Sequence, residues 1–184
     1  MDRAQDYDAN DTTPGSGSLF PAENSQSCPV SSVTTLSYDW TTLGNKIDAM
    51  VASGGTNQTI GLAHGMQMLT DGAPYNSGAL PANTTRYIIL LSDGLNTMDR
   101  WYGDGRHPSP PIAARMALAC TNATNQGFVV YTLFVDLGGT QGNSSVLQSC
   151  ASDSSKYYDL TQSSQIVTAF NQIATQITQL RVSK

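Results

Sequence analysis

The chain has 184 residues, a formal net charge of -5 and only nine lysines and arginines. This length suits one domain with a hydrophobic core of ordinary size, and the lack of a basic cluster argues against a nucleic-acid partner. No apolar run approaches the roughly 18 residues that span a membrane, and the first residues lack a signal-peptide pattern, so we expect any membrane tether or export signal to lie outside this sequence.

Residues 1–29 have scattered aspartates and prolines and no apolar periodicity. This composition predicts an irregular arm rather than a helix or strand. The spacing of the carboxylates does not fit a calcium loop, which needs glycine at its sixth position and glutamate at its twelfth. We therefore expect no calcium site in this arm.

The segment 30–38 is rich in β-branched residues that loosely alternate with polar ones, which predicts a strand with one solvated face. Asp39 then precedes a helical spacing of apolar residues, so we expect a capped amphipathic helix that ends at 53–55. Another helix is expected from Leu62 to Leu69, ending near 71–72.

Five apolar or aromatic residues run without a break from Tyr87 to Leu91. A short run of this kind predicts a strand buried on both faces, which is typical of a parallel sheet covered by helices. Predicted helices and strands alternate after it: a helix from Ile112 to Asn125, a strand over 128–135, a short helix at 146–150, a strand over 157–160, and a helix from Ile166 to Leu180. This order predicts an α/β fold built from βαβ units.

Asp93 follows the strand that ends at Leu91, where open α/β sheets place their ligands. Thr56 lies in a turn that leads into a helix, and its hydroxyl either caps that helix or reaches a ligand at the edge of the sheet. A hydroxyl and a carboxylate on neighbouring loops suit a hard cation such as Mg2+. The pair Thr56 and Asp93 is therefore a candidate metal site.

Other kinds of site have weaker support in the sequence. The glycines around Thr56 resemble a phosphate-binding loop, but no lysine follows them. His64 and His107 are the only histidines, and no Gly-x-Ser-x-Gly elbow accompanies them. No pair of carboxylates is singled out by spacing, so we expect no enzyme activity, with a hydrolase of unknown type as the least favoured alternative.

The three cysteines, Cys28, Cys120 and Cys150, are far apart in the sequence. Their spacing excludes a zinc knuckle and a Cys-x-x-Cys redox pair. Buried thiols and one disulfide in an oxidising compartment are both compatible with it.

Several stretches together resemble the von Willebrand factor type A domain of TadG-like pilus-assembly proteins. They are Gly55–Leu62, Arg86–Thr97 with Arg100–Trp101, Gly127–Thr132, Val146–Ser152 and Ala169–Val182. The upstream part also resembles a long insertion in that family. The resemblance implies an arm from this insertion over 1–29 and, over 30–184, an incomplete type A domain with a Rossmann-like, mostly parallel sheet flanked by helices.

Type A domains bind a divalent cation at a metal-ion-dependent adhesion site, made by Asp-x-Ser-x-Ser, a threonine and an aspartate. Thr56 matches the threonine and Asp93 matches the aspartate, but no Asp-x-Ser-x-Ser occurs in the chain. The resemblance thus implies that the chain lacks the first strand, first helix and second strand of the family fold. We expect Mg2+ or Mn2+, which the full-length family member could bind, to bind weakly or not at all here.

The missing strands would leave an apolar edge at Tyr87–Leu91, which invites pairing with another strand. Either the predicted strand over 30–38 pairs there, or a second copy of the chain does. We therefore expect a rearranged sheet or a homodimer through this edge.

The resemblance implies a non-enzymatic protein-binding and assembly module of a bacterial tight-adherence (Tad/Flp) pilus system, on the periplasmic or extracellular side of the cell envelope. The alternative is a purely structural envelope domain that binds no metal. An envelope location favours a disulfide between Cys120 and Cys150, which would leave Cys28 unpaired.

Overall fold

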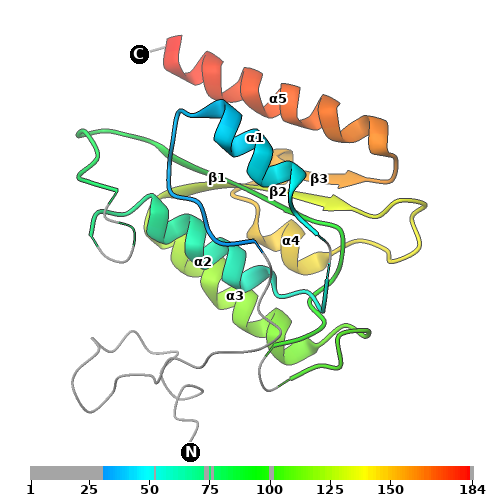
Figure 1. The fold of residues 1–184 in the computed structure, drawn as a ribbon. Helices are drawn as coiled ribbons and strands as arrows, with labels where there is room; N and C mark the ends of the chain where they lie inside the picture. Colours follow the sequence, from blue (N-terminus) through cyan, green and yellow to red (C-terminus); the bar gives the residue numbers. More distant parts are fainter. Residues whose placement is uncertain (1–30, 52, 73–74, 76, 100–101, 183–184) are drawn as a thin grey trace, which may run out of the picture.

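A computed structural model describes residues 31–51, 53–72, 75, 77–99 and 102–182 of the chain. This part is a mixed α/β structure with one parallel sheet in the order β1-β2-β3, flanked by helices (Figure 1). The strands are β1 (Arg86–Ser92), β2 (Phe128–Val135) and β3 (Tyr157–Leu160). The architecture is compatible with a Rossmann-like fold. None of the helices in these residues has the length and apolar character needed to cross a membrane.

Strands and helices alternate along the chain, as the sequence predicts. Helix α3 (Pro110–Asn125) connects β1 to β2, and α4 (Ser145–Cys150) lies between β2 and β3. Both strand pairs are parallel, with Arg86 opposite Phe128 in the first and Thr132 opposite Tyr157 in the second. The carboxyl ends of the strands therefore meet at one edge of the sheet.

The core has two parts, one on each face of the sheet. Side chains of α2 (Gln58–Met68), α3 and α4 pack on one face, and α5 (Ser163–Val182) covers part of the other face (Figure 1). Strand β2 is buried on both faces, which explains why its sequence is apolar apart from Thr132.

Strand β1 is buried on one face only, which corrects the sequence prediction for Tyr87–Leu91. Ile88 and Leu90 are buried in the core that includes α2 and α3, whereas Ile89 and Leu91 are 39% and 44% exposed. The physical reason is that β1 lies at the edge of the sheet in the described residues, whereas α5 covers mainly the part of this face formed by β2 and β3. A run of apolar residues alone cannot distinguish an edge strand from a central one.

Two glycines bring α2 close to β1. A Cβ atom added at Gly61 would lie 3.6 Å from a methyl group of Leu90, and one at Gly65 would lie 3.5 Å from Ile88. Without side chains at these two positions, the helix backbone lies almost directly on the strand.

The strand predicted over 30–38 is not found: residues 31–38 form no strand, and residue 30 lies outside the described part. This result excludes a rearranged sheet in which residues 31–38 pair with β1. A β-branched sequence forms a strand only with a neighbour to hydrogen-bond, and this segment has none among the described residues. The arm predicted over 1–29 also lies outside that part.

The predicted helix after Asp39 is present as α1 (Trp40–Asp48). The Asp39 carboxylate caps it by accepting a 3.0 Å hydrogen bond from the Thr42 N–H. The helix ends earlier than predicted and none of its residues is buried. Local sequence therefore determines that α1 forms, without burial of its residues against the described part of the chain.

Cys120 and Cys150 form a disulfide that joins α3 to α4 within the core, as the resemblance implies. Cys28 lies outside the described residues.

We predict that reduction of this disulfide lowers the free energy of unfolding by about 3 to 4 kcal/mol, because the bond closes a loop with a sequence separation of 30 residues. Urea unfolding of the oxidised and reduced protein measures the difference. The variant Cys28→Ser is the control and should unfold as the unmodified chain does. Equal stability of the oxidised and reduced forms would contradict the prediction.

Candidate functional site

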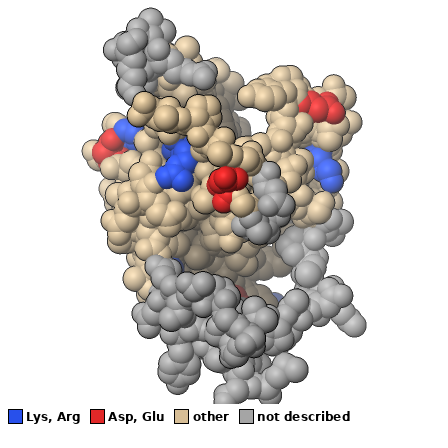
Figure 2. All heavy atoms as spheres, turned by 90° about the vertical axis from the view of Figure 1, so that its left-hand side faces the viewer, with Lys and Arg blue, Asp and Glu red and all other residues tan. Residues whose placement is uncertain are grey.

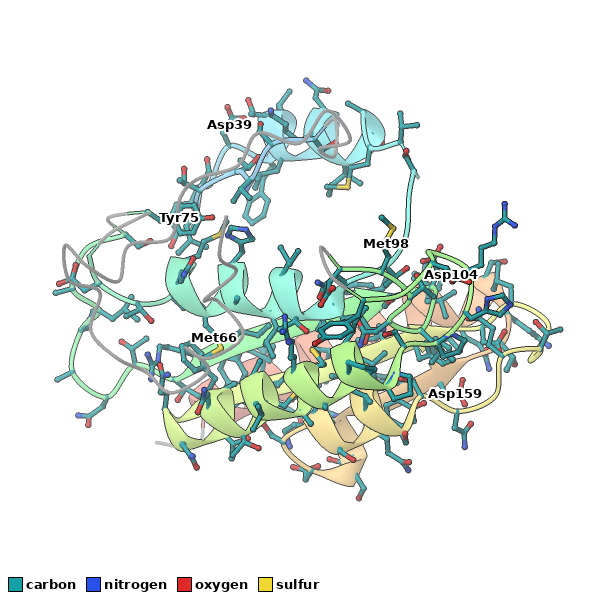
Figure 3. The ribbon with its side chains drawn as sticks, turned by 90° about the horizontal axis from the view of Figure 1, so that it is seen from below. Asp39, Met66, Tyr75, Met98, Asp104 and Asp159 are labelled. Carbon is teal, nitrogen blue, oxygen red and sulfur yellow. A yellow bond between two sulfur atoms is a disulfide. The ribbon has the colours of Figure 1, made fainter. Side chains whose placement is uncertain are left out.

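The candidate site lies at the carboxyl end of β1, where two loops are hydrogen-bonded to each other. The Thr56 N–H donates to Thr97 Oγ1 at 2.9 Å. In return, the Thr56 carbonyl oxygen accepts hydrogen bonds from the N–H groups of Thr97 (2.9 Å) and Met98 (3.2 Å). Met98 accordingly lies beside one end of α2 (Figure 3). These bonds fix the loop before α2 against the loop after β1.

A buried pair of carboxamides joins the same two loops more deeply. The Gln58 N–H donates to Asn96 Oδ1 at 2.8 Å, and Asn96 Nδ2 donates to Gln58 Oε1 at 3.1 Å. Gln58 Nε2 also donates to Ser92 Oγ (3.1 Å) and to the Gly94 carbonyl oxygen (2.7 Å). Gln58, Ser92 and Asn96 are all buried. Because buried polar groups are costly without partners, this network strongly restricts the position of the loops.

The structure excludes one of the two roles considered for Thr56. Asn57, and not Thr56, is the N-cap of α2, since its Oδ1 accepts a 3.2 Å hydrogen bond from the Thr59 N–H. The Thr56 hydroxyl makes no hydrogen bond with any described residue. It lies beside Gly94, where an added Cβ atom would be 3.3 Å from Thr56 Oγ1. The hydroxyl is thus next to the residue that follows Asp93 and is available to a ligand.

Asp93 is exposed, and its carboxylate accepts no hydrogen bond from the described part of the chain. Its main chain is held in place, because Gln141 Nε2 donates to the Asp93 carbonyl oxygen at 3.0 Å. The carboxylate that follows the neighbouring strand, β2, is buried, in contrast to that of Asp93. Asp136, directly after β2, is buried and accepts hydrogen bonds from three N–H groups of the following loop, those of Thr140 (3.1 Å), Gln141 (2.8 Å) and Gly142 (3.2 Å).

The two strand-terminal aspartates therefore have different roles. Asp136 organises the loop after β2, whereas the Asp93 carboxylate is free to bind a ligand. The sequence analysis did not identify Asp136. Its position in the sequence could have identified it, because it directly follows a buried strand and precedes Gly138 and Gly139. A carboxylate before a glycine-rich turn often accepts hydrogen bonds from the N–H groups of that turn.

Thr56 and Asp93 would contribute two oxygen ligands to a cation. No group of three or more histidine, cysteine, aspartate or glutamate side chains gathers anywhere in the described residues. Because Mg2+ prefers six oxygen ligands, water or groups from another chain would complete the coordination.

The histidines lie in separate environments. His64 Nδ1 is hydrogen-bonded to the Tyr75 hydroxyl. His107 Nδ1 lies 2.6 Å from Asp104 Oδ2 on an exposed loop, and hydrogen bonds from His107 and from the Arg106 N–H lower the pKa of Asp104. Ser92 Oγ donates to the Gly94 carbonyl oxygen at 2.9 Å. Neither histidine is therefore paired with Ser92 in a nucleophilic arrangement.

A cavity of about 280 Å3 lies behind Asn96, between the loop after β1 and the first residues of α3 and α4. Its walls are mainly apolar and include Leu95, Pro108, Ala113 and Val146. Thr56 and Asp93 do not line it, so the candidate metal ligands belong to the open edge of the sheet and not to this cavity.

No family model matches the chain, and no curated protein or solved structure matches it either. The case for a function consequently rests on the resemblance of the motifs and on the geometry of this edge.

We predict that Gln58→Ala and Asn96→Ala each lower the free energy of unfolding by about 1 to 3 kcal/mol, because each leaves buried hydrogen-bonding groups without partners. Urea unfolding followed by circular dichroism measures the change. Gln67→Ala, at an exposed position of the same helix, is the matched control and should have little effect. A double variant that costs as much as the sum of the two single variants would argue against a coupled network.

Proposed function

We propose that this chain is a non-enzymatic protein-binding module that acts through the edge of the sheet containing Thr56 and Asp93. The observation that carries the proposal is that the Thr56 hydroxyl and the Asp93 carboxylate lie on two mutually hydrogen-bonded loops and have no partner among the described residues. Rigid support combined with unused oxygen ligands is what a ligand-binding site requires.

The ligand that best fits these groups is a divalent cation, Mg2+ or Mn2+, since both groups are hard oxygen ligands. With two protein ligands, binding to this chain alone is weak. A carboxylate from a partner protein would supply another ligand and strengthen binding, so the cation would bridge the two proteins.

The resemblance to TadG-like proteins suggests the system in which this binding module would act. We propose an incomplete von Willebrand factor type A domain with a remnant of the metal-ion-dependent adhesion site, which binds components of a tight-adherence pilus system. The Cys120–Cys150 disulfide supports a periplasmic or extracellular location, because disulfides persist in oxidising compartments. A membrane tether would lie outside this sequence.

The alternative is a purely structural envelope domain. The observation in its favour is the buried network of Gln58, Ser92 and Asn96, which would stabilise the loops whether or not a cation binds. A hydrolase remains the least favoured reading, since His64 contacts Tyr75 and His107 contacts Asp104, and neither contacts a serine or cysteine among the described residues.

Titration with Mn2+, followed by electron paramagnetic resonance, tests the proposed site. We expect weak binding, with a Kd on the order of 1 mM. Asp93→Ala should remove this binding because it deletes the charged ligand, and Thr56→Val should weaken it because valine has nearly the shape of threonine but no hydroxyl.

Asp159→Ala is the matched control, since Asp159 is also exposed and lies on β3. It should leave Mn2+ binding unchanged. Equal affinity of the unmodified chain and the Asp93→Ala variant would favour the structural alternative.

A further inference from the structure

The cavity between the loop after β1 and the first residues of α3 and α4 has the composition of a small-molecule site. Its volume of about 280 Å3 is close to the lower limit for ligand pockets, which range from about 300 to 1,000 Å3. Such pockets are lined mainly by apolar side chains, with a few polar groups that fix the orientation of the ligand. The mainly apolar walls of this cavity meet the first condition, and Ser109 meets the second.

Ser109 supplies an unused hydroxyl to this cavity. The residue lines the cavity and is only 7% exposed. It is the N-cap residue of α3, yet its side chain makes no capping hydrogen bond, and its hydroxyl has no other partner among the described residues. Its main chain is fixed, because its N–H donates to the Asn96 carbonyl oxygen at 2.8 Å and its carbonyl oxygen accepts a hydrogen bond from the Ala113 N–H at 3.0 Å. The hydroxyl is therefore a fixed and unsatisfied group that a ligand in the cavity could bind.

The cavity offers no charge to a ligand, since none of the described residues that line it is charged. The start of α3 does not favour an anion either, because its first two residues, Pro110 and Pro111, have no N–H to donate. A charged group moved from water into this cavity would lose its hydration without gaining a counter-ion. The cavity therefore favours an uncharged ligand.

The face at the other end of the sheet gives no sign of a charged binding surface. Figure 2 shows this face as mostly uncharged, with the Lys, Arg, Asp and Glu side chains of the described residues scattered over it. Scattered charges do not form the concentrated field that attracts an ionic ligand. The cavity is consequently a better candidate for a further site than this face.

The walls of the cavity are fixed to one another. The disulfide between Cys120 and Cys150 joins α3 to α4, which form two of the walls. The wall from the loop after β1 is held through Asn96, whose carboxamide is hydrogen-bonded to Gln58. Binding to a pocket with fixed walls costs little conformational entropy. The cavity is thus preformed, rather than a gap that a small movement of its walls would close.

We propose that this cavity binds a small uncharged molecule with an apolar body and one hydroxyl or carbonyl group, which forms a hydrogen bond with the Ser109 hydroxyl. The cavity volume of about 280 Å3 corresponds to about nine molecules of liquid water, at about 30 Å3 each. This size suits a ligand with a single ring or a short branched chain. Neutral alcohols, phenols and ketones of this size are the ligands that fit.

This site is separate from the proposed cation site. Thr56 and Asp93 do not line the cavity, and an uncharged ligand requires no metal. Binding can therefore be measured in the presence of a chelator, where the result does not depend on whether Mn2+ binds. The two proposals can fail separately.

The test uses the full chain with a chelator present and benzyl alcohol as the probe, followed by nuclear magnetic resonance. We expect benzyl alcohol to bind with a Kd on the order of 1 mM. Binding should shift the amide signals of residues that line the cavity, namely 95–96, 109, 113 and 143–146. Benzoate, which has a charged group in place of the hydroxyl, should bind at least about tenfold more weakly at neutral pH, because the cavity supplies no counter-charge.

The variant Ser109→Ala tests the hydrogen bond, with toluene as a second probe that has the same ring but no hydroxyl. This variant should weaken the binding of benzyl alcohol about fivefold and leave the binding of toluene unchanged, because it deletes only the hydroxyl. It should fold normally, since the Ser109 side chain makes no capping hydrogen bond.

Two further variants locate the probes on the protein. Ala113→Leu fills the cavity from α3 and should abolish the binding of both benzyl alcohol and toluene. Ala114→Leu, at an exposed position of the same helix, should leave the binding of both unchanged.

Four results would overturn the proposal. They are no binding of benzyl alcohol well above the expected Kd, equal binding of benzoate and benzyl alcohol, an equal effect of Ser109→Ala on benzyl alcohol and toluene, and unchanged binding by a folded Ala113→Leu variant. The first of these would mean that water or another part of the chain fills the cavity.

Discussion

The burial of β2 on both faces is the constraint on which the described structure depends. It pairs with β1 and β3, and it contributes to both hydrophobic clusters. The disulfide between α3 and α4 reinforces the cluster on one face. Strand β1 depends on β2 for pairing and on α2 and α3 for the cover of one face. Among the described residues, β1 is an edge strand of the sheet, and the side chains of Ile89 and Leu91 on one of its faces are exposed.

The loops of the candidate site are held in place by the packing of α2 on β1. Ser92 is the last residue of β1, and the Gln58 carboxamide reaches from α2 to hydrogen-bond with it and with the loop beyond. The position of Thr56 relative to Asp93 thus follows from the docking of α2 on β1. The glycines that allow this docking, Gly61 and Gly65, act on the site without touching it.

The parts of the fold that local patterns determine were predictable from the sequence. The strand over 128–135, the cap at Asp39 and the alternation of strands and helices after β1 are confirmed. The prediction of a strand over 30–38 was wrong for residues 31–38, because their sequence satisfies a strand pattern but the described structure gives them no neighbouring strand. The start of α2 at Gln58 was missed, because a buried glutamine depends on Asn96, a partner 38 residues away. The spacing of apolar residues along the chain gives no information about a hydrogen bond between two polar residues so far apart.

The candidate site was predictable in its members but not in its detail. A carboxylate after a buried strand identified Asp93, but the same rule applies to Asp136, which the structure assigns to holding its own loop. The sequence places both residues similarly. The difference arises from the following residues, because the turn after β2 directs its N–H groups at the carboxylate, whereas the loop after β1 is held by Thr56, Gln58 and Gln141 instead.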